Sequence, residues 1–89
     1  MYLVVIEVET PGWQVDPDQL LRTLRHSTAD SDMVQHTHVR VGVGRVVLSL
    51  YLQAANRATA ARWAGELARR TMATVPASQG WRIVSVRTL

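Results

Sequence analysis

Two histidines separated by one residue are the clearest candidates for chemistry in this chain. In His36-Thr37-His38, an extended strand would carry both imidazoles on one face, about 7 Å apart. Such a pair can hold zinc when a third ligand converges on it. The chain has no cysteine, and the nearest carboxylate expected on that face, Glu7, lies across an intervening strand. We therefore expect no metal site and interpret both histidines as exposed edge-strand residues.

Sequence signatures of catalysis are missing. No Ser/His/Asp or Cys/His set has a spacing typical of nucleophilic catalysis. The glycines of Val41-Gly42-Val43-Gly44 predict a hairpin, and no helix follows them as a phosphate-binding loop would require. We assign no catalytic residue and expect no cofactor.

Length and composition bound the possibilities further. The 89 residues are enough for a single domain, 1–89. The absence of cysteine excludes disulfides and thiolate chemistry and fits a reducing compartment. No apolar run reaches the roughly 18 residues of a membrane span, and the first residues lack the pattern of a secretory signal. We expect a cytoplasmic protein without membrane contact.

The basic residues are unusual in kind and in position. All ten are arginine, which binds carboxylate and phosphate bidentately, although codon bias in a GC-rich genome gives the same composition. Eight of the ten arginines lie at or after Arg40, and six of the seven acids lie at or before Asp32. Such asymmetry can mark a nucleic-acid face, but these arginines are spread over two strands and a helix.

The elements that position these residues follow from periodicity and turn signals. Period-two alternation predicts strands, and apolar spacing with capping residues predicts two helices. The glycines around Val43 predict a tight hairpin. The expected order is a strand Tyr2–Glu9, a helix from N-cap Asp16 to His26 or Ser27, a strand Met33–Val41, a strand Arg45–Gln53, a helix from N-cap Asn56 to Met72 or Ala73, and a strand Trp81–Thr88.

This βαββαβ order resembles the ferredoxin-like α+β fold. It implies one four-stranded antiparallel sheet, with strand order 4-1-3-2 and both helices on one face. The fold alone does not indicate a function, because it hosts many.

The sheet face without helices is the main predicted site. We expect it to have an apolar centre and a polar, basic margin, formed by Leu3, Val5, Glu7, His36, His38, Arg40, Val47, Ser49 and Tyr51. For the last strand, either Val84 and Val86 or Trp81, Ile83 and Ser85 could point outward. An exposed apolar patch on a small domain usually marks binding or self-association. Alternatively, strand twist lets Tyr51 and the long side chains cover the patch.

RNA-recognition motifs share this topology and stack bases on aromatic residues of the two central strands. Here only Tyr51 could stack, and Glu7 and Glu9 on the same face would repel phosphate. We do not expect nucleic-acid binding.

The turn after the first strand, Glu9-Thr10-Pro11-Gly12, resembles the Asp-x-Pro-Gly turn of ACT domains. Those βαββαβ modules bind amino acids or similar small ligands and pair through their sheets. The resemblance implies that Gly12 lets backbone N–H groups approach a ligand and that Pro11 fixes the turn. Glu9 replaces the aspartate, and the Gly-Ile-Asn stretch that follows the first helix in that family is absent. A generic strand-to-helix turn also explains Pro-Gly.

By length and element order, the chain also resembles the dimeric α+β barrel proteins, which include cofactor-free monooxygenases and polyketide cyclases. That resemblance implies a site between sheet and helices, with His36, His38, Arg40, Tyr51 and Trp81 as candidates.

We interpret the chain as a non-enzymatic accessory or regulatory module. Its open sheet face is expected to bind a second copy, giving a homodimer, or to bind a protein or small-molecule partner. The alternative is a cofactor-independent enzyme of the dimeric α+β barrel type.

Overall fold

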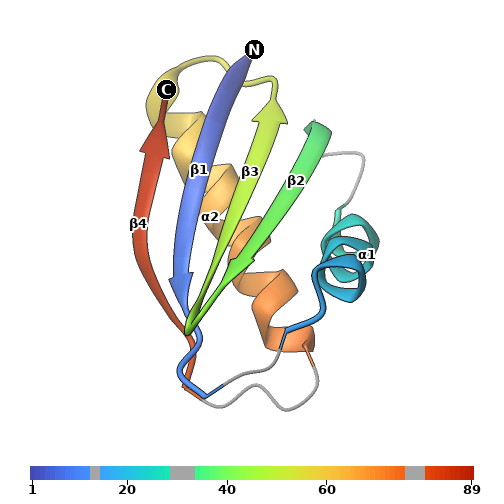
Figure 1. The fold of residues 1–89 in the computed structure, drawn as a ribbon. Helices are drawn as coiled ribbons and strands as arrows, with labels where there is room; N and C mark the ends of the chain where they lie inside the picture. The colour runs from blue at the N-terminus through green and yellow to red at the C-terminus, as the bar shows by residue number, and fades with distance from the viewer. Residues whose placement is uncertain (13–14, 29–33, 76–79) are drawn as a thin grey trace.

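The computed structural model describes residues 1–12, 15–28, 34–75 and 80–89 (Figure 1). Four strands form one antiparallel sheet in the order β2-β3-β1-β4, and both helices pack on the same side of it. The elements are β1 (Tyr2–Glu9), α1 (Pro17–Ser27), β2 (Val34–Gly42), β3 (Arg45–Leu52), α2 (Arg57–Thr74) and β4 (Arg82–Thr88). The predicted α+β class, element order and strand order are confirmed.

Both helices begin at the predicted caps. Asp16 Oδ1 accepts a hydrogen bond from the Asp18 amide at 3.0 Å, and Pro17 occupies the first helical position. Asn56 Oδ1 accepts from the Thr59 amide at 2.8 Å. Side-chain oxygens thus satisfy amides that have no partner within the first helical turn. Among the described residues, no helix is long and apolar enough to cross a membrane.

The core lies between the sheet and the helices. Alternate residues of β1 and β3 point inward, as period-two patterning predicts, and all of them except Tyr2 are fully buried. Small residues on the inner side of α2 let this helix approach the sheet closely, and half-buried Trp63 packs beside them. The buried apolar residues are Val4, Ile6, Val8, Leu20, Leu24, Val46, Leu48, Leu50, Leu52, Ala60, Ala64, Leu67, Ala68 and Met72.

The hairpin between β2 and β3 is tighter than its two glycines suggest. Gly42 is still paired, opposite Arg45, so the turn consists of Val43 and Gly44 alone. Gly44 has φ +69°, a conformation that glycine adopts without steric cost. Its carbonyl accepts from the Thr10 amide at 2.9 Å, which ties the end of β1 to the hairpin.

A β-bulge in β4 resolves the orientation that the sequence left open. Glu7 lies opposite Ser85 but Val8 lies opposite Ile83, so Val84 is the extra residue. After the bulge, the residues of β4 that point outward have the same parity as Ser85, whereas before it Ile83 points inward. Each of the two predicted orientations therefore holds for only part of the strand. Ser85 lies on the open face, whereas Ile83 and Trp81 pack against the core.

Candidate interaction face

The side of the sheet without helices gathers all nine residues predicted for the binding site. Residues directly opposite each other in an antiparallel pair share a face, so the register orders them in rows. The rows, from β2 to β4, are His36, Tyr51 and Leu3; His38, Ser49, Val5 and Arg87; Arg40, Val47, Glu7 and Ser85; and Gly42, Arg45, Glu9 and Arg82. We call this surface the open face.

One half of the open face is mainly apolar. Tyr51 lies opposite Leu3 on one side and opposite His36 on the other, and its ring meets the imidazole edge-on with centroids 6.3 Å apart. Leu89 lies beside Leu3, because its amide donates to the Leu3 carbonyl at 2.8 Å. Tyr51 is 42% exposed and Leu89 63%. This half lies at the end of the sheet where both termini lie (Figure 1).

The other half carries ion pairs. The Glu7 carboxylate lies 2.6 Å from Arg45 Nη1, and Arg82 Nε donates to Glu9 Oε1 at 2.9 Å. Both acids that the sequence places on this face therefore have a cation from a neighbouring strand. Their charge is locally compensated, which weakens the repulsion of an anion that was expected from them.

The two edge strands each carry an uncompensated cation. Arg40 on β2 is exposed, as is Arg87 on β4. Within the described parts of the chain, neither guanidinium has a hydrogen bond or an ion pair. The margin of the open face is therefore positively charged on both sides, with the exposed imidazoles of His36 and His38 along β2.

The apolar centre is shallow. Leu3, Val5 and Val47 are half-buried by their neighbours within the sheet. No described helix or loop lies over them, because α1 and α2 pack on the opposite side (Figure 1). Tyr51 is itself exposed, and its ring lies edge-on against His36.

Neither histidine belongs to a metal-binding cluster formed by described residues. Across the described residues, no three histidine, cysteine or acidic side chains are placed to hold an ion. Glu7, the carboxylate considered as a third ligand, is engaged by Arg45.

The Pro11–Gly12 turn is separate from the open face. Both residues are exposed and directly follow Thr10 at the end of the sheet near the hairpin. Gly12 has φ +76°, and a Cβ placed there would have no atom within 4 Å. Glycine is therefore favoured at this position by its positive φ, and not by a lack of space for a side chain. Trp13 and Gln14, which follow in the sequence, lie outside the described residues.

Four of the five residues considered for an enzyme site share one face of the sheet. His36, His38, Arg40 and Tyr51 share the open face, whereas Trp81 packs against the core. On the side that the helices cover, the inward residues of β1 and β3 other than Tyr2 have no solvent-accessible surface.

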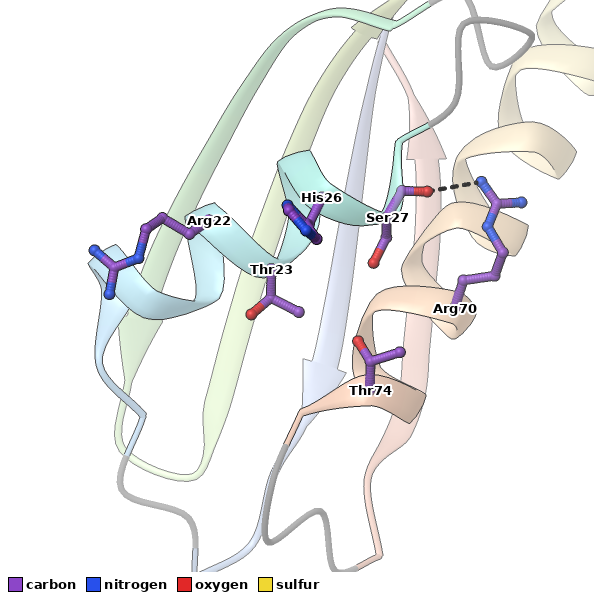
Figure 2. Close-up of a pocket in the computed structure, with 6 residues that line it drawn as sticks. All are labelled: Arg22, Thr23, His26, Ser27, Arg70 and Thr74. Atoms are coloured by element: carbon purple, nitrogen blue, oxygen red, sulfur yellow. Dashed lines mark hydrogen bonds between the residues drawn. The ribbon is translucent and has the colours of Figure 1, made fainter.

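A second concavity lies between the helices, on the far side from the open face (Figure 2). It encloses about 540 Å³ and is lined by Arg22, Thr23, His26, Ser27, Arg70 and Thr74. Sequence analysis missed this groove, because no motif marks the packing of one helix against another.

The polar groups of the groove serve the helices themselves. Arg70 Nη2 donates to the Ser27 carbonyl at 3.4 Å, at the carbonyl end of α1 (Figure 2). Thr23 Oγ1 donates to the Gln19 carbonyl, and Thr74 Oγ1 to the Thr71 carbonyl. Figure 2 shows Arg22 extending away from the other lining side chains. Among the described residues that line the groove, Thr23, Arg70 and Thr74 thus donate to backbone carbonyls of the two helices.

The sequence also missed part of the open face itself. Arg82, Arg87 and Leu89 belong to it, but the bulge at Val84 breaks the period-two pattern that would have revealed them. Glu9 and Arg45 were expected to face outward, and their ion pairs follow from the register.

Comparison with known proteins adds no functional information. No family model matches the chain, and a search of curated proteins finds no significant match.

Proposed function

We propose that this protein is a small, non-enzymatic accessory or regulatory module that binds another protein surface through the open face. That surface belongs either to a second copy of the chain or to a different protein. The supporting observation is a sheet with helices on one side only, whose other side has an apolar half and a charged half. A contiguous apolar surface with a polar rim is typical of an interaction site.

The catalytic alternative is a cofactor-independent enzyme that uses the open face. His36→Ala or Tyr51→Phe would then abolish turnover without changing the mass of the particle. The separation of Trp81 from the other candidates speaks against this alternative. An ACT-like role, with a small ligand at Pro11 and Gly12, has the exposed positive-φ turn in its favour and nothing more.

Charged substitutions at apolar positions of the open face test the proposal. Val5→Asp and Val47→Asp place a carboxylate where a docked surface would bury it. Each new carboxylate also lies opposite an exposed guanidinium, Arg87 or Arg40, and would neutralise that cation. Both effects oppose docking. Val43→Asp is the matched control, because Val43 is fully exposed at the hairpin tip, away from the face. Light scattering on a size-exclusion column measures self-association, and affinity purification from the source cells measures binding of other proteins.

The proposal expects one of these associations to be lost in both face variants and kept in Val43→Asp. Circular dichroism should show that all three variants are folded. An association that survives both face substitutions would refute the open face as the interface. So would a wild-type protein that stays monomeric and retains no partner.

A further inference from the structure

We infer that the open face accepts an acidic, amphipathic segment of a different protein. This inference rests on the proposed function and names the occupant of the surface. Apolar side chains of that segment would pack on Leu3, Val5 and Tyr51, and its carboxylates would pair with Arg40 and Arg87.

Charge complementarity is the first argument. The open face carries four arginines, Arg40, Arg45, Arg82 and Arg87, against two acids. Both acids are already engaged within the sheet, by Arg45 and Arg82. Two cations remain uncompensated, one on each edge strand, and a carboxylate accepts the planar guanidinium fork bidentately.

A second copy of the chain fits this surface poorly. Two open faces in contact would bring four uncompensated guanidinium groups into one interface, two from each copy. The acids that could neutralise them, Glu7 and Glu9, are held by their own cations. Juxtaposed like charges suppress association.

Nucleic acid is also a poor match. Sheets that bind single strands stack bases on aromatic side chains, and here the central strands contribute one, Tyr51. The positions beside it are aliphatic Leu3 and Val5. Aliphatic side chains flanked by arginines suit a peptide with apolar and acidic residues better.

The geometry sets the spacing of the acids in the partner. Arg40 and Arg87 are three strand spacings apart across the sheet and one row apart along it, a separation of about 16 Å. A helix laid across the strands spans that distance in about ten residues, and an extended segment in about five. The apolar residues of the partner would lie between the two acids.

Selection from a random library of displayed peptides tests this without a known partner. The protein serves as bait in three forms: wild type, Arg40→Glu/Arg87→Glu, and Arg62→Glu/Arg69→Glu. The last pair makes the same change of net charge on exposed positions of α2. It controls for general attraction between a basic protein and acidic peptides. Enriched peptides are then synthesised and titrated against each form, with amide NMR shifts locating the contact.

The inference expects enriched peptides with acids on both sides of apolar residues. Binding should weaken at least about tenfold, or about 1.4 kcal/mol, in Arg40→Glu/Arg87→Glu. It should stay within about twofold in Arg62→Glu/Arg69→Glu, and the shifts should fall on all four strands, because Arg40 lies on β2, Leu3 and Val5 on β1, Tyr51 on β3 and Arg87 on β4. Equal loss in both double variants, enrichment without acids, or no enrichment at all would overturn the inference.

The open face can still be an interface if it does not bind an acidic peptide. A wild-type dimer that Val5→Asp dissociates would retain the open face as an interface and assign it to a second copy. Tight binding of a random single-stranded oligonucleotide pool, lost in Arg40→Glu/Arg87→Glu, would assign it to nucleic acid.

Discussion

At the scale of single residues, adding a Cβ atom should have opposite effects on stability at Gly12 and at Gly65. Gly12 has φ +76°, where an L-residue is strained by about 1–2 kcal/mol. Gly65 lies buried within α2, and a Cβ there would have no atom within 4 Å. Alanine in place of a helical glycine reduces the entropy lost on folding.

Gly12→Ala should therefore lower the free energy of unfolding by about 1 kcal/mol, and Gly65→Ala should raise it by a similar amount. Gly12→Asn should recover part of the loss, because asparagine tolerates positive φ. Urea denaturation measures all three. If Gly12→Ala leaves stability unchanged, the turn relaxes to another conformation and the glycine has no conformational role.

At the scale of elements, β3 separates the two sides of the sheet within one strand. Leu50 points inward and has no exposed surface, whereas Val47 lies on the open face and is half-buried. Leu50→Ala should cost about 3 kcal/mol, because it removes buried methyl groups and leaves a cavity. Val47→Ala should cost about 1 kcal/mol or less, since Val47 is still partly in water.

Thermal and urea unfolding of the two alanine variants gives the comparison. Should Leu50→Ala fail to fold, Leu50→Val provides a smaller step in the same direction. Equal costs at both positions would mean that the open face is covered in the isolated protein, which contradicts its availability to a partner.

Element order and the two central strands could be predicted because their information is local. Alternation in β1 and β3, the caps Asp16 and Asn56, and the glycines near Val43 each act within a few residues. The orientation of β4 could not be predicted, because the bulge at Val84 depends on pairing with β1, far away in sequence. The ion pairs of Glu7 and Glu9 likewise depend on how distant strands align. The sequence alone therefore could not predict which arginines of the open face have no partner.

At the scale of the whole molecule, folding and binding should respond differently to salt. The core consists of apolar residues, and the ion pairs Glu7–Arg45 and Glu9–Arg82 lie on the surface, where such pairs contribute about 0–1 kcal/mol each. The net charge is +3. Docking of an acidic peptide, in contrast, depends on exposed cations at the sheet edges, and screening weakens their attraction.

Raising NaCl from about 0.1 M to about 1 M shortens the Debye length from about 10 Å to about 3 Å. The affinity for a library-selected acidic peptide should then fall by about tenfold, or about 1.4 kcal/mol, while the midpoint of thermal unfolding changes little. Isothermal titration and calorimetric melting measure the two quantities on the same sample. In Arg40→Gln/Arg87→Gln the residual affinity should lose most of its salt dependence, because the cations that attract the peptide are gone and no new charge repels it. An affinity that is constant or rises with salt would show that apolar contact alone holds the peptide, and the edge arginines would then have no part in choosing the partner.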